Sequence, residues 1–215
     1  MQKITLPTYT KGEELFNAVT HGIGVLFGIF VLLYCLFSAR SVWGTVSGSI
    51  YGGSMILLYG ISTLYHALRP GGGKRVFRVL DHCSIYYLIA GTYTPILLCG
   101  IRPVYPGWAW ALFGIVWGCA AAGTVFTAVD LKKFSRFSMT AYIAMGWCIV
   151  LALRPAVKAL PMQALLWILF GGIAYTVGAV LYGVGKKHPY IHGVFHLFVL
   201  LGSALQFAGV AMLSC

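Results

Sequence analysis

The chain has 215 residues, of which 60% are hydrophobic and only 9% are charged. A soluble globular domain carries roughly 25% charged residues, so this composition excludes a soluble protein and indicates an integral membrane protein. Fifteen basic and four acidic residues give a net charge of +11, but the basic residues lie in short breaks between apolar runs, as in membrane-protein loops. The sequence has no basic stripe interleaved with aromatic residues, which argues against nucleic acid as a partner.

Charged residues divide the sequence into seven charge-free windows. The shortest, 137–153, has 17 residues, the lower limit for a spanning helix. Prolines fall at most window edges, where helices begin or end. We therefore predict an all-α integral membrane protein, a single domain over residues 1–215 built as a bundle of seven transmembrane helices. The predicted helices cover about residues 17–38, 42–67, 80–100, 107–129, 137–153, 162–184 and 190–213.

Features inside these windows bear on packing. Small residues recur at four-residue spacing, as at Gly48 and Gly52, which lets helix backbones approach closely in lipid. Pro95 lies inside a window and is expected to kink the third helix. The six cysteines lie in or beside apolar runs without C-x-x-C spacing, so we expect small core residues rather than disulfides.

The distribution of Lys and Arg predicts the orientation of the helices. If the N-terminus is cytoplasmic, eleven basic residues lie inside and four outside, in agreement with the positive-inside rule. We predict a multi-pass protein of the cell (cytoplasmic) membrane with its N-terminus in the cytoplasm and its C-terminus outside. The inside set is Lys3, Lys11, Arg69, Lys74, Arg75, Arg78, Lys132, Lys133, Arg136, Lys186 and Lys187, and the outside set is Arg40, Arg102, Arg154 and Lys158.

Two histidines, His192 and His196, lie four residues apart in the first turns of the last predicted helix. On a helix this spacing puts both imidazoles on one face, with Cβ atoms roughly 5–6 Å apart, and metal ions use such pairs readily. The run 188–215 contains no Asp, Glu, Lys or Arg, and ionisable groups in such runs usually mark function. The structural alternative is two histidines hydrogen-bonded to neighbours at the headgroup level.

Further polar residues converge on the same leaflet. His66 lies in the last turn of the second predicted helix, and Asp81 opens the third. Three histidines and a carboxylate fit a catalytic zinc site, which has three protein ligands and a position for water. We predict that His66, His192 and His196 bind Zn²⁺. Asp81 would contact the zinc water or act as its base, and Ser62, one turn before His66, would support the ligands.

Other candidates are less directly placed. Glu14 and His21 are seven residues apart on one face of the first helix and could form a capping or proton-relay element. His82 is a poor ligand candidate, because adjacent helical residues point about 100° apart. His188, beside two lysines, is expected to be a solvated loop residue.

At these residues the sequence resembles the hemolysin III family, the bacterial branch of the progestin and adipoQ receptor superfamily, which includes the adiponectin receptors. The resemblance implies a seven-helix membrane fold that holds zinc through three histidines, matched here by His66, His192 and His196, with Asp81 as the acid that contacts water. It also implies kinship with membrane hydrolases that cleave lipid amides, including alkaline ceramidases. The motifs that carry it are Glu14-x2-Asn17-x3-His21-Gly22-x-Gly24, Ser62-x3-His66, Leu80-Asp81-His82, Ala90-Gly91-Thr92-Tyr93-Thr94-Pro95 and His192-x3-His196.

Three functions follow as hypotheses. The first is a zinc-dependent hydrolase of a lipid amide or ester whose acyl chain lies between the helices. The second is a non-catalytic membrane protein in which zinc clamps helices and which acts in membrane or lipid homeostasis. The third is a pore-forming or lytic protein, although the sequence has no chain of intramembrane acids to relay ions. The expected partners are the lipid bilayer and a lipid substrate, and the sequence does not fix the oligomeric state.

Overall fold

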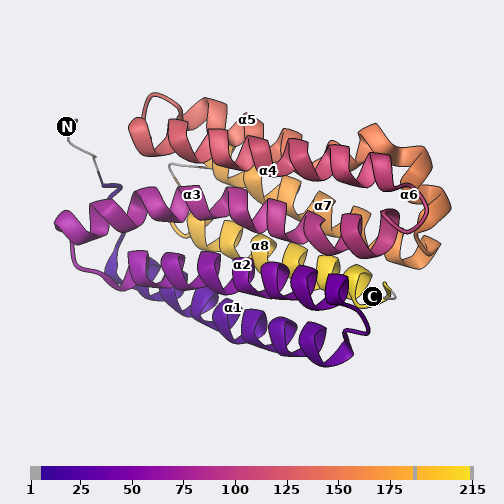
Figure 1. The fold of residues 1–215 in the computed structure, drawn as a ribbon. Helices are drawn as coiled ribbons and strands as arrows, with labels where there is room; N and C mark the ends of the chain where they lie inside the picture. Colours follow the sequence, from indigo (N-terminus) through magenta and orange to yellow (C-terminus); the bar gives the residue numbers. More distant parts are fainter. Residues whose placement is uncertain (1–5, 186–187, 214–215) are drawn as a thin grey trace.

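Every element of regular structure in residues 6–185 and 188–213, the part of the chain that the computed structural model describes, is helical (Figure 1). Because η1 continues α3, and α5, η2 and α6 form one segment, these residues contain seven membrane-length helical segments. The prediction of a seven-helix all-α membrane protein is therefore confirmed. The elements are α1 (Lys11–Ser38), α2 (Val42–Ala67), α3 (Gly72–Pro95), the π-helical η1 (Ile96–Ile101), α4 (Pro106–Val129), α5 (Ser135–Gly146), the 3₁₀-helical η2 (Cys148–Ala152), α6 (Leu153–Ala159), α7 (Met162–Gly185) and α8 (Ile191–Val210).

Six of the described segments are long and apolar enough to cross a membrane, and α2 is the exception. This helix has 26 residues, but its buried positions include Ser47, Ser54 and Ser62. It packs against α1 on one side and α3 on the other (Figure 1). A helix flanked by protein meets less lipid, so it can carry buried serines. The hydroxyl groups of Ser47 and Ser54 donate to backbone oxygens of the same helix.

The α1–α2 contact depends on glycines, as their spacing predicts. A Cβ atom added at Gly52 would lie 2.5 Å from the Cα of Leu32, and one at Gly48 would lie 2.6 Å from the Cβ of Cys35. Neither distance leaves room for a methyl group, so the two backbones are in direct contact at these positions. Small residues give this close approach in lipid, where van der Waals packing is a main force between helices.

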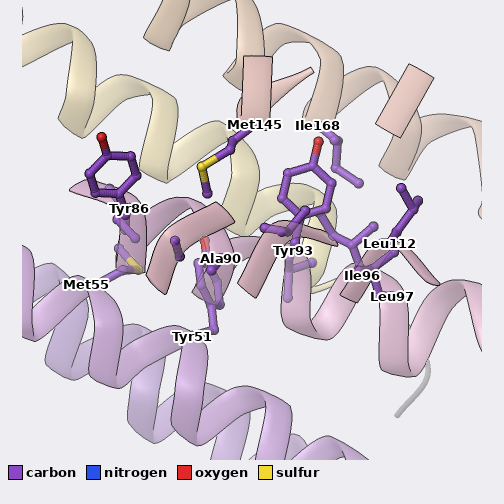
Figure 2. Close-up of a cluster of buried hydrophobic side chains, with 14 of the residues drawn as sticks. Tyr51, Met55, Tyr86, Ala90, Tyr93, Ile96, Leu97, Leu112, Met145 and Ile168 are labelled. Atoms are coloured by element: carbon purple, nitrogen blue, oxygen red, sulfur yellow. The ribbon is translucent and has the colours of Figure 1, made fainter. Parts of the chain in front are cut away.

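The third segment is the centre of the bundle. Its apolar window is 83% buried, whereas the corresponding windows of α1, α4 and α7 are each 28% buried. Figure 2 shows the core that surrounds it, with side chains from α3 and η1 meeting those of four other helices. The labelled core residues are Tyr51, Met55, Tyr86, Ala90, Tyr93, Ile96, Leu97, Leu112, Met145 and Ile168.

The fifth segment differs from the single helix predicted over 137–153. It runs from Ser135 to Ala159 and changes to 3₁₀ geometry over Cys148–Ala152. The hydroxyl of Tyr93 on α3 donates to the backbone oxygen of Gly146 (2.8 Å) and accepts from the backbone N–H of Ile149 (3.0 Å). A remote side chain thus satisfies the backbone groups that the break releases, as the membrane interior requires.

Other boundaries also differ from the prediction. Helix α1 begins at Lys11 rather than near residue 17, because Thr10 and Glu13 form a capping box in front of it. Helix α3 begins at Gly72 rather than near residue 80, so its first turns are basic. At Pro95 the third segment changes from α- to π-helical hydrogen bonding. The start of α1 lies at one end of the bundle, and the end of α8 lies at the opposite end (Figure 1).

The cysteines follow the prediction with one correction. Cys35, Cys83, Cys119 and Cys148 are free thiols. Cys99 is disulfide-bonded, contrary to the expectation. Sequence spacing alone does not determine which cysteines pair, which explains the miss.

Candidate metal centre

Three histidines meet at the end of the bundle where α2 ends and α8 begins. His66 is in the last turn of α2, and His192 and His196 are in the first two turns of α8. The Nε2 atom of His192 lies 3.2 Å from Nε2 of His66 and 3.1 Å from Nε2 of His196. All three side chains are buried, and one ligand atom from each lies within 4.8 Å of the others. Among the described residues, this is the group of side chains that could hold a metal ion.

The two distances from Nε2 of His192 to the other Nε2 atoms are compatible with one tetrahedral metal ion. Bonds of 2.0–2.1 Å with tetrahedral angles put ligand atoms about 3.3 Å apart, close to the two distances here. The Nδ1 atoms of His66 and His196 face oxygen acceptors, so both protons lie on Nδ1 and both Nε2 lone pairs point toward His192. Nε2 of His192 carries at most one proton and cannot bond to both, whereas a cation satisfies all three nitrogens.

The outward nitrogens of two ligands are held by α1. Nδ1 of His66 donates to Oε2 of Glu14 (2.7 Å), and Oε1 of the same carboxylate accepts from Nζ of Lys74 on α3 (2.6 Å). Nδ1 of His196 lies 3.3 Å from the backbone oxygen of Asn17. Because metal-binding histidines are usually oriented by a hydrogen bond to the second nitrogen, these contacts prepare both Nε2 atoms for a ligand role.

Two aromatic rings from the N-terminal part of the chain cover the histidines. The Tyr9 ring stacks on His192 with centroids 5.4 Å apart and lies 5.8 Å from His66. The ring of His21 stacks on His196 with centroids 3.5 Å apart. Burial raises the pKa of the Tyr9 phenol well above its ordinary value, so this covering ring is neutral.

A cavity of about 380 Å³ extends from the histidines into the bundle. Its polar end is lined by Ser62, Asp81, His192 and His196, and the remaining walls are mainly apolar side chains of α3, α5, α7 and α8. Asp81 is buried but is not part of the group of mutually close ligand atoms. The arrangement thus joins a metal-binding group, a nearby carboxylate and an apolar space.

The structure also places the weaker candidates. Glu14 reaches His66, and His21 reaches His196, so both lie at the centre rather than merely near a helix end. His82 lines the cavity, and its Nδ1 lies 2.9 Å from the backbone oxygen of Arg78. His188 is an exposed residue between α7 and α8.

Two residues of the centre, Lys74 and Tyr9, are not predicted from the sequence. Lys74 has the sequence pattern of a loop charge, yet it is only 3% exposed and pairs with Glu14. Its place seven residues before Asp81 puts both on one face of α3, a signal that could have been read. Tyr9 precedes the first helix, where no periodic pattern points to the site.

Comparison with known proteins now identifies the family. The model of the family described as haemolysin-III related matches residues 9–207. The chain belongs to the haemolysin-III related family. This confirms the family resemblance on which part of the sequence interpretation depends.

The relatives of this haemolysin-III family chain match over nearly its whole length. It is 40% identical to hemolysin-3 of Bacillus cereus over 96% of this chain and 94% of the relative. It is 41% identical to a hemolysin-3 homolog of Bacillus subtilis (strain 168), over 93% of each chain. Human monocyte to macrophage differentiation factor is 26% identical over 92% of this chain and 83% of the relative. No solved structure matches the chain.

Proposed function

We propose that this haemolysin-III family protein binds one zinc ion through His66, His192 and His196 and hydrolyses a lipid amide or ester within the membrane. One observation carries the proposal: two of the three mutually close histidines, His192 and His196, line the polar end of a largely apolar cavity. An acyl chain fits such walls, and its carbonyl group would then lie beside the histidines. Neutral imidazole ligands favour zinc over magnesium or calcium, which prefer oxygen ligands.

The residues around the cavity have chemical roles in this proposal. When bound, zinc would supply Lewis acidity and an activated water. Asp81 would accept a proton from that water and return it to the leaving amine or alcohol. The hydroxyl of Ser62, which has no hydrogen-bond partner in the described part of the chain, would donate to the substrate carbonyl. Water thereby cleaves the C–N bond of an amide or the C–O bond of an ester. The products are a fatty acid and an amine or alcohol.

The proposal includes an orientation. The bundle end that carries the histidines is the end where α2 passes into α3, and the basic residues between and at the start of these helices include Arg69, Lys74, Arg75 and Arg78. Basic loops face the cytoplasm. We therefore place the site in the cytoplasmic leaflet of the cell membrane.

The test is turnover of a panel of amide and ester lipids by the purified protein, followed by fatty-acid release. Asp81→Asn keeps the side-chain size but removes the base. In this variant zinc should remain bound while turnover falls by about 10²–10⁴-fold, the usual contribution of a positioned general base. Equal turnover by both proteins would show that Asp81 is not the base. Full zinc occupancy without turnover on any lipid would contradict the hydrolase.

A second candidate is a structural zinc clamp. It is favoured by the position of Asp81 outside the group of ligand atoms and by ligands from α2 and α8, which lie far apart in the sequence. In that case zinc would join these helices in a protein of membrane or lipid homeostasis, and removal of zinc would unfold the site end. The relative from Bacillus cereus is named hemolysin-3, so lysis of erythrocytes belongs in the same assay series.

A further inference from the structure

The geometry points to Glu14 as the positioning residue of the metal centre. We propose that its carboxylate fixes the tautomer and direction of His66, and that Lys74 is present to balance the buried charge of Glu14. The inference rests on the proposed metal site. Both residues would then contribute to metal affinity. Lys74 would be more than a charged loop residue, and Glu14 more than a helix-capping residue.

The Glu14 carboxylate determines which nitrogen of the His66 ring carries the proton. An ionised carboxylate only accepts hydrogen bonds, so the 2.7 Å contact fixes the proton of His66 on Nδ1. The lone pair of Nε2 is then directed at the other two histidines, the orientation that a ligand needs. A carboxylate behind a histidine also makes the ring a more basic ligand.

The three histidines differ in the hydrogen-bond acceptor at Nδ1. Nδ1 of His196 faces a backbone oxygen at 3.3 Å, a longer contact to a neutral group. Nδ1 of His192 has no hydrogen-bond partner in the described residues. His66 is thus the ligand with a carboxylate behind it in the described part of the chain, and Glu14 should contribute more to metal affinity than the contacts of the other two.

Lys74 supplies the charge that pairs with Glu14. Its side chain is 3% exposed and that of Glu14 is 20% exposed, and a charge buried to this degree is costly unless it is paired. The ammonium group lies 2.6 Å from Oε1 of Glu14 and 3.0 Å from the backbone oxygen of Leu68. The pair ties α1 to the end of α2 and the start of α3, so the helix that carries Asp81 is positioned against the same carboxylate.

Single substitutions at either residue would leave an unpaired buried charge and confuse folding with positioning. The experiment therefore compares two double variants in which both charges are absent. Glu14→Gln with Lys74→Met keeps an oxygen that can accept from His66. Glu14→Met with Lys74→Met has nearly the same volume but no such acceptor. Zinc affinity is measured by competition with a chromophoric chelator in detergent, with tryptophan fluorescence to verify folding.

We expect the Gln variant to bind zinc about 10–100-fold more tightly than the Met variant, the size of outer-shell effects on metal affinity. With Co²⁺ as a spectroscopic probe, the visible absorption bands of the Met variant should shift, whereas those of the Gln variant should stay close to wild type. A merely structural role for Glu14 would leave the two spectra alike. If the Met variant does not fold, Glu14→Asn with Lys74→Met replaces it, since the shorter amide is polar but does not reach His66.

The outcomes separate the two proposals. Wild-type protein that binds no zinc or Co²⁺ would overturn the metal site and this inference together. Wild-type binding with affinities of the two double variants within about threefold, and matching spectra, would overturn only the role of Glu14. Weaker binding in the variant without the acceptor, with rescue by Gln, would establish Glu14 as the residue that positions His66.

Discussion

Tyr93→Phe tests how the broken fifth segment is held. The change removes one hydroxyl, which bonds to the backbone oxygen of Gly146 and to the backbone N–H of Ile149. The ring, which is 6% exposed and packs in the core (Figure 2), keeps its place. Only the two hydrogen bonds are lost, so the expected effect can be built from them alone.

Hydrogen bonds between membrane helices contribute on average about 0.6 kcal/mol and at most about 1.7 kcal/mol each. Two bonds therefore give a loss of about 1–3 kcal/mol in the free energy of unfolding. For a chain of this size each kcal/mol corresponds to about 2–4 °C in Tm, so the midpoint should fall by about 2–12 °C.

The assay is thermal or SDS-induced unfolding in detergent, followed by tryptophan fluorescence. The matched control is Tyr87→Phe on the same helix, because the Tyr87 hydroxyl has no hydrogen bond among the described residues. The control should unfold like wild type. A Tyr93→Phe protein as stable as that control would refute the reasoning that this hydroxyl supports the break.

Two further changes extend the tests. In α2, Gly52→Ala puts a methyl group 2.5 Å from the Leu32 Cα and should destabilise the protein by about 1–3 kcal/mol, whereas Gly53→Ala, which meets no atom within 4 Å, should be neutral or stabilise by up to about 1 kcal/mol. Equal effects in an unfolding titration would contradict close α1–α2 packing. Reporter fusions after Lys133 and after Cys215 should report the cytoplasm and the outside respectively, and the same side for both would overturn the orientation drawn from the positive-inside rule.

The sequence predicted the helices well because charged residues are costly in lipid. They therefore concentrate in the loops, and the uncharged windows between them mark the helices. The sequence also predicted that three histidines meet, because His192 and His196 share a helix face and because the helix order brings the end of α2 and the start of α8 to one end of the bundle. Local spacing and helix order were therefore enough to predict the three-histidine group. No knowledge of side-chain packing was needed.

What the sequence did not reveal depends on contacts between distant residues. The 3₁₀ break after Gly146 lies in an unbroken apolar run, and its released backbone groups are satisfied by Tyr93 from another helix. Lys74 looks like any other loop lysine until α1 places Glu14 opposite it. The ring of Tyr9 comes to His192 only because the capping box at Thr10 starts α1 beside the site.

The central claim is a zinc ion held by three histidines, and the most direct test is the zinc content of the purified protein at low, buffered free zinc. Wild type should carry one zinc per chain. His192→Ala should lose affinity by at least 10–100-fold, the size found even for outer-shell changes, while the control His188→Ala, at an exposed turn, should retain full occupancy. Wild-type protein without metal, or His192→Ala protein with the same occupancy as wild type, would contradict the account.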